Sequence, residues 1–79
     1  MKPLNKPVNN QINPAKLLLS KWTAVLPQNK EKHFLVTKLN EDELGMVLTC
    51  TLEAVLNKQE YEMDWRDLKD SASWLTGWR

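Results

Sequence analysis

Few residues in this sequence have the types and spacing that catalysis or metal binding requires. His33 is the only histidine, and no carboxylate or cysteine forms a recognisable catalytic signature with it. Cys50 is the only cysteine, and it lies on the apolar face of an expected strand, where a thiol is inert. Glu60, Glu62 and Asp64 alternate along a second expected strand, a pattern typical of its solvated side. We therefore expect no enzymatic activity, no metal site and no cofactor.

The four tryptophans are the stronger signal. Alternation along the expected strands places Trp22 and Trp65 in the core. Trp74 and Trp78 flank Leu75–Gly77, where complete burial is difficult. Two partly exposed rings beside basic side chains can stack a nucleobase or clamp a peptide; alternatively, they cover the open end of a small barrel. The candidate binding residues are Lys21, Trp22, Trp74, Trp78 and Arg79.

The chain is expected to be organised around a hairpin that begins at Met46. In Met46–Leu56, an apolar face made of Met46, Leu48, Cys50, Leu52, Ala54 and Leu56 alternates with a mostly polar one. In Glu60–Arg66, Tyr61, Met63 and Trp65 alternate with charged residues, and we expect this strand to run to about Asp67. Asn57–Gln59 suits the intervening loop. Helical spacing also fits Asn40–Leu56, but Gly45 and the β-branched residues favour a strand.

The remaining elements follow from local signals. Asn13 and Pro14 predict a helix start, with one or two turns reaching Leu18 or Leu19. Strands are predicted over Ser20–Pro27 and His33–Leu39, joined by a charged turn, and an acidic loop over Asn40–Gly45. Asp70–Ser73 predicts a single helical turn carrying Trp74. The expected fold is all-β: a four- to five-stranded antiparallel SH3-like barrel with a short helical turn near each end. It spans residues 13–79, preceded by a flexible arm over residues 1–12.

Length and composition set the biological context. A chain of 79 residues has room for one domain, and a single cysteine allows no internal disulfide, which suits a reducing compartment. We expect a soluble, cytoplasmic protein, because no targeting segment or membrane-spanning run is present. Net charge is +6 through Lys38 (seven lysines, one acid) and −5 from Leu39 onward (nine acids, four bases). Such asymmetry can indicate a basic binding surface. Alternatively, the two halves of the domain pair electrostatically, or each forms a solvated face.

Four segments together resemble a known family: INPAKLLLSKWTAVLP, KEKHFLVT, LEAVL and WRDLKDSASWLTGW. The chain is similar over Ile12 to Arg79 to the Trp-rich family of small bacterial proteins found in cyanobacteria and proteobacteria. Trp22, Trp74 and Trp78 match the pattern of that family, whereas Trp65 occupies a position where an aromatic or large apolar residue is expected. The resemblance implies no particular activity or ligand.

Two hypotheses for the function follow. In the first, the protein is a small interaction module that recognises a partner protein through an aromatic surface. In the second, it is a nucleic-acid-binding accessory protein, in which lysines before residue 39 meet phosphates and exposed indoles stack on bases. We favour the first, because the sequence lacks the aromatic-interleaved basic motif of RNA-binding sheets. Neither hypothesis involves a membrane.

Overall fold

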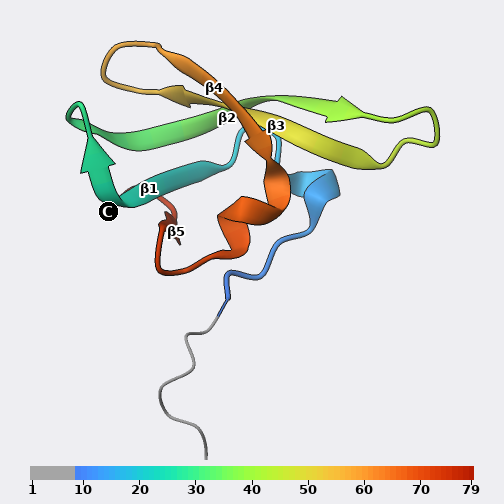
Figure 1. The fold of residues 1–79 in the computed structure, drawn as a ribbon, viewed down its shortest axis with the longest axis horizontal. Coiled ribbons are helices and arrows are strands. Elements are labelled where there is room, and N and C mark those ends of the chain that lie inside the picture. Colours follow the sequence, from blue (N-terminus) through green and yellow to red (C-terminus); the bar gives the residue numbers. More distant parts are fainter. Residues whose placement is uncertain (1–8) are drawn as a thin grey trace, which may run out of the picture.

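The computed structural model describes residues 9–79 and contains a single antiparallel sheet of five strands, in the order β4-β3-β2-β1-β5 (Figure 1). The elements in chain order are η1 (Pro14–Lys16), β1 (Lys21–Gln28), β2 (Glu31–Glu41), β3 (Val47–Ala54), β4 (Glu60–Asp64), η2 (Trp65–Lys69) and β5 (Trp74–Thr76). The prediction of an all-β fold with a short helical turn near each end is confirmed. The sheet is open, however, with β4 and β5 as its two edges, so closure into an SH3-like barrel is not confirmed. Within residues 9–79 no helix is long and apolar enough to span a membrane.

The turns form where the sequence predicts them. Between β1 and β2, Asn29 and Lys30 both have positive φ (54° and 62°), as in the tight turns that match strand twist. Between β2 and β3, the Asp42 carboxylate accepts hydrogen bonds from the backbone N–H groups of Leu44 and Met46, ahead of the third strand. Between β3 and β4, the Ala54 N–H donates to the carbonyl of Gln59, which confirms the predicted hairpin.

Two predicted elements differ from the structure near the C-terminus. The fourth strand ends at Asp64 rather than about Asp67, because the Asp64 carboxylate accepts from the Arg66 N–H and caps η2. Trp74 does not lie in a helical turn; it begins β5 and pairs with Ala24 of β1. The Asp70 carboxylate caps the turn just before β5, where it accepts from the Ala72 N–H.

The core occupies the inner face of the sheet, which η1 and η2 cover. Leu17, which follows η1, and Leu68 of η2 are both buried against this face. Asn13 caps η1 through a hydrogen bond from the Ala15 N–H, as predicted, although the element is one short turn. Trp22 is buried, which confirms its predicted place in the core. The buried apolar residues are Leu17, Trp22, Phe34, Val36, Cys50, Leu52, Ala54 and Leu68.

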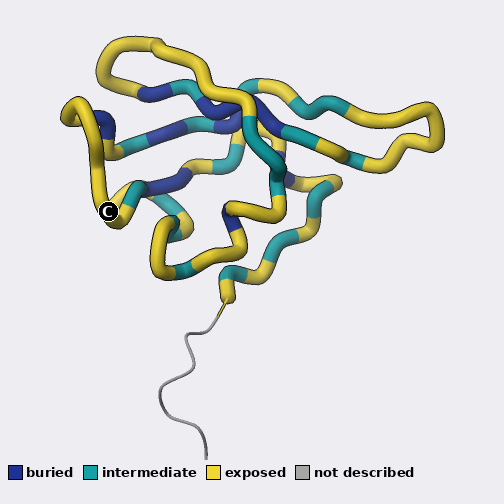
Figure 2. The backbone as a smooth tube through the Cα atoms, viewed as in Figure 1, coloured by how far each residue is buried: buried dark blue, intermediate teal, exposed yellow. Residues whose placement is uncertain are grey.

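The apolar face of β3 extends further than the core does. Cys50, Leu52 and Ala54 are buried as predicted, but Leu48 is exposed. The strand is also shorter than the predicted Met46–Leu56, so Met46 and Leu56 lie outside it and are exposed. The hairpin of β2 and β3 protrudes beyond the layer that covers the inner face, and its tip is exposed (Figure 2). The pairing of β3 with β2 changes register between Thr49 and Val47, so Leu48 lies at an irregularity of the ladder rather than in the regular alternation of the core. Trp65 is half-buried at the start of η2, where its indole N–H donates to the Val47 carbonyl at 2.9 Å.

The predicted flexible arm falls mostly outside the described residues. Of its last four residues, Asn10 and Ile12 contact the domain. The Asn10 side chain donates hydrogen bonds to the carbonyls of Leu68 and Trp74, both at 2.8 Å. Ile12 packs against the core. This part of the chain is thus attached to the region that joins η2 to β5.

Candidate binding groove

The predicted binding residues do not form one surface. Trp22 is buried, and its indole N–H donates to the Ser20 hydroxyl at 2.8 Å, so it has no ring face to offer a ligand. Trp74 and Trp78 contact adjacent residues of β2: the Trp74 ring packs edge-on against Phe34 at 5.3 Å, and the Trp78 ring lies 6.1 Å from the His33 ring. Neighbouring residues of a strand point to opposite faces, so the two indoles lie on opposite sides of the sheet.

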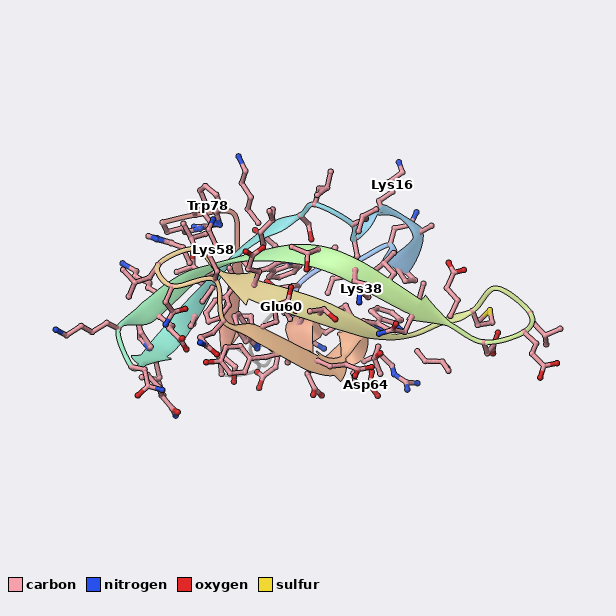
Figure 3. All side chains as sticks on the ribbon, turned by 90° about the horizontal axis from the view of Figure 1, so that it is seen from above. Lys16, Lys38, Lys58, Glu60, Asp64 and Trp78 are labelled. Atoms are coloured by element: carbon pink, nitrogen blue, oxygen red, sulfur yellow. The ribbon has the colours of Figure 1, made fainter. Side chains whose placement is uncertain are left out.

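The first side of the sheet carries a patch made of Lys21, His33, Trp78 and Arg79, here called the C-terminal patch. Trp78, labelled in Figure 3, is 44% exposed. The Lys21 Nζ lies 4.8 Å from the centroid of its ring. The His33 Nε2 lies 3.0 Å from the Arg79 carbonyl oxygen. The structure therefore places Lys21, Trp78 and Arg79 in one patch. The Lys21 ammonium group, however, already lies over the Trp78 indole.

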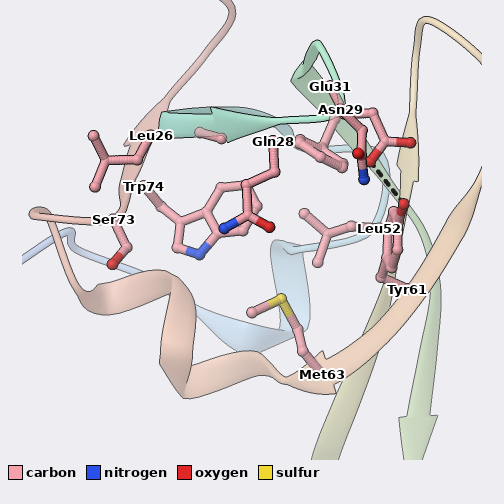
Figure 4. Close-up of a pocket in the computed structure, with 11 residues that line it drawn as sticks. Leu26, Gln28, Asn29, Glu31, Leu52, Tyr61, Met63, Ser73 and Trp74 are labelled. Carbon is pink, nitrogen blue, oxygen red and sulfur yellow. Dashed lines mark hydrogen bonds between the residues drawn. The ribbon is translucent and has the colours of Figure 1, made fainter.

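The other side of the sheet opens into a groove of about 460 Å³ (Figure 4). Tyr61 and Met63 of β4 contribute one wall, and Ser73 and Trp74 contribute the other. The groove therefore lies between β4 and β5, the two edge strands of the sheet that residues 9–79 form, where closure would have produced a barrel. Its lining residues are Ala24, Leu26, Gln28, Asn29, Glu31, Phe34, Leu52, Tyr61, Met63, Ser73 and Trp74.

Glu31 is the charged residue that lines the groove, and it is only 6% exposed. Its Oε1 accepts a hydrogen bond from the Tyr61 hydroxyl at 2.6 Å, and its Oε2 accepts one from the Asn57 side-chain amide at 2.7 Å. The hydrogen bond to Glu31 raises the pKa of Tyr61, with smaller contributions from burial and from the negative charge. Sequence reasoning placed Glu31 in a charged turn and missed this role, because its partners lie 26 and 30 residues away.

The remaining candidate groups are engaged within the fold. Burial raises the pKa of the Cys50 thiol to about 11, with smaller contributions from Asp64 and Asp67, so the nucleophilic thiolate is disfavoured near neutral pH. Glu62 accepts hydrogen bonds from Thr49 and Asn40. Asp64 pairs with Arg66 at 2.9 Å, and hydrogen bonds from the Arg66 side chain and backbone lower the pKa of that carboxyl. Glu62 and Asp64, two of the three β4 carboxylates, are thus engaged with neighbouring side chains.

Comparison with known protein families confirms the resemblance noted in the sequence. Residues 20–79 match a family model described as "Tryptophan-rich protein (DUF2389)". The chain belongs to this family. The matched region contains all five strands, η2 and all four tryptophans, and therefore both the groove and the C-terminal patch. No curated protein and no solved structure matches the chain.

Proposed function

We propose that this protein is a small non-enzymatic interaction module, and that it binds a segment of a partner protein in the groove. The observation that carries the proposal is the position of the groove between β4 and β5, the two edge strands of the sheet that residues 9–79 form. Its floor is apolar, with Phe34 and Leu52, and its rim exposes Leu26 and Tyr61. An exposed apolar concavity of this kind is a common feature of interaction sites.

The free edge of β4 supports binding of an extended segment. Glu60–Asp64 pairs with β3 along one side, and the sheet ends there. An edge strand presents unpaired N–H and C=O groups, to which an extended peptide can add as a further strand. A segment docked on β4 would lie over the groove and place alternate side chains into it. Backbone pairing would then supply affinity, and the groove would supply selectivity.

The chemistry of the groove favours binding over catalysis. Its ionisable residues are Glu31 and Tyr61, which are hydrogen-bonded to each other. Neither pairs with a histidine or a cysteine in the way that nucleophilic catalysis requires. Cys50 is buried and His33 is associated with the Arg79 carbonyl. These arrangements support the assignment of a non-enzymatic role.

Nucleic-acid binding is the second candidate, and the C-terminal patch is the observation that favours it. Lys21, Trp78 and Arg79 combine positive charge with a partly exposed indole. Two features make this candidate weaker. The cation already covers the ring on which a base would stack, and the indole N–H is bonded to the Phe34 carbonyl.

Affinity capture with matched variants tests both candidates. Leu26 is 79% exposed at the groove, and Leu44 is 88% exposed at the tip of the β2–β3 hairpin, so glutamine at either position should leave the fold intact. Under the first candidate, Leu26→Gln loses the partner and Leu44→Gln keeps it, and nuclease treatment changes neither result. Under the second, nuclease abolishes capture, and affinity falls steeply with salt. Equal capture by the two leucine variants would contradict the groove assignment.

A further inference from the structure

The chemistry of the groove indicates what kind of partner side chain enters it. Glu31 is buried, and the two hydrogen bonds that its carboxylate accepts come from neutral donors, Tyr61 and Asn57. A carboxylate has about four lone-pair positions, so each oxygen can accept one more hydrogen bond. Figure 4 shows the bond between Glu31 and Tyr61 at the side of the groove.

No cation of the described chain balances this carboxylate. Within residues 9–79 the single ion pair joins Arg66 to Asp64. Lys30 and Lys58 lie in the two turns beside Glu31 and Asn57, but both are exposed and neither forms an ion pair with Glu31. A buried negative charge is unfavourable unless it is paired and hydrogen-bonded, so a positive charge brought into the groove would be stabilised there.

The edge that a partner would pair with is also negative. Glu60, Glu62 and Asp64 alternate along β4, and Glu53 of β3 pairs directly with Glu60. Figure 3 labels Glu60 and Asp64 on this strand. Arg66 neutralises only Asp64. A basic segment would meet complementary charge along this edge, whereas an acidic one would be repelled.

The remaining lining suits a long aliphatic stem. Leu52, Met63 and Trp74 line the groove with apolar and aromatic surface. Lysine and arginine bury their methylene stems along such surface while their charged heads reach a polar site. An aromatic ring in the wall also attracts a cation.

We infer that the partner segment is basic, and that it inserts a lysine or arginine side chain into the groove with its cationic head at Glu31. This inference rests on the proposed function, since it specifies the chemistry of the segment that binds along β4. The charged head adds a hydrogen bond to an oxygen of Glu31 that already accepts one from Tyr61 or Asn57. The apolar stem of the inserted side chain contacts the remaining, apolar residues that line the groove.

Selection from a phage-displayed library of short linear peptides on the full chain tests the inference. The selected peptides should carry a lysine or arginine between apolar residues. Replacing that residue with norleucine keeps the stem and removes the charge, and should weaken binding by about tenfold or more. In Glu31→Gln the same replacement should change the affinity by less than about twofold, because the charge at the site is gone.

A second variant keeps the test independent of whether Glu31→Gln folds. Tyr61→Phe keeps the ring and removes one neutral donor, so Glu31 gains a free acceptor position. The penalty for norleucine should be at least as large in Tyr61→Phe as in the natural protein. A smaller penalty there would contradict the role of Glu31.

The outcomes separate this inference from the proposed function. If no selected peptide loses binding to Leu26→Gln, the groove is not the partner site and both proposals fail. If peptides bind at the groove but lack a basic residue, the proposed function stands and the inference is overturned. An equal norleucine penalty in the natural protein and in Glu31→Gln overturns it as well.

Discussion

The indole N–H of Trp78 donates a hydrogen bond to the carbonyl oxygen of Phe34, 2.9 Å away. This bond fastens the C-terminal segment onto β2. The Thr23 hydroxyl lies beneath the same segment, where it donates to the Gly77 carbonyl and accepts from the Arg79 N–H. Gly77 has a φ of +78°, a backbone conformation that glycine adopts readily and that turns the chain back here. Trp78 therefore contributes to stability although its ring is half-exposed.

The two kinds of tryptophan should differ in their effect on stability. Trp78→Ala removes one hydrogen bond and partial burial, so we expect a loss of about 1–2 kcal/mol in the free energy of unfolding. Trp22→Ala removes a fully buried ring and should lose about 3–5 kcal/mol. That loss approaches the whole stability of a small domain, so Trp22→Ala should be largely unfolded. Urea denaturation followed by circular dichroism measures both values, and equal losses would show that Trp78 is a core residue.

Asn10 should stabilise the wall of the groove that contains Trp74. Its amide bridges the carbonyls of Leu68 and Trp74, so it ties η2 to β5. Asn10→Ala leaves two carbonyls without this donor and should lower the free energy of unfolding by about 1–3 kcal/mol. Asn9 is exposed, and Asn9→Ala should change the free energy of unfolding by less than about 0.5 kcal/mol. Thermal melts compare the two, and identical melting temperatures would show that the Asn10 contacts are dispensable.

Most strands can be predicted from the sequence, because the alternation of residue types within each strand is a local signal. Alternation places Cys50 and Leu52 on one face, and turn residues mark where the hairpins close. The cap at Asn13 is likewise a local signal. These features depend on neighbours a few residues apart, so a pattern along the chain is sufficient to find them.

The elements that form the groove depend on contacts between distant residues. The strand β5 has three residues, too few for a periodic pattern, and exists through its pairing with β1. The alternation pattern also gives no strand with which Trp74 pairs. The sequence analysis therefore grouped Trp74 with Trp78 as one candidate binding surface. The burial of Glu31 requires Tyr61 and Asn57, which come from later elements. No signal near residue 31 distinguishes a buried carboxylate from a solvated one.

The extent of the core can be measured with two leucines of β3. Leu52 is 1% exposed and Leu48 is 47% exposed, although the sequence alternation assigns both to one apolar face. Leu52→Ala should lower the free energy of unfolding by about 2–5 kcal/mol, because it leaves a cavity in the core. Leu48→Ala should lower it by about 1 kcal/mol or less. Equal losses in urea denaturation would show that the β2–β3 hairpin is covered in solution.

Alkaline pH should destabilise the fold through Cys50. Burial is the main reason that the pKa of this thiol is raised from 9.0 to about 11 in the folded protein. Below about pH 8 the thiol is protonated in both states, so its contribution to stability is fully present. Between pH 9 and pH 11 the unfolded chain loses the proton and the folded chain keeps it. Stability must then fall as the pH rises.

The expected size of this effect follows from the pKa difference. Each unit corresponds to about 1.4 kcal/mol, so the Cys50 contribution should decrease by about 2–3 kcal/mol between pH 9 and pH 11. Cys50→Ala is the matched control, since it keeps every other ionisable group and lacks the thiol. Urea denaturation of both proteins in the presence of a reductant should give a difference in stability that is constant up to about pH 8. Above that pH the difference should shift steadily in favour of the variant. Parallel curves up to pH 11 would show that the thiol is accessible to solvent.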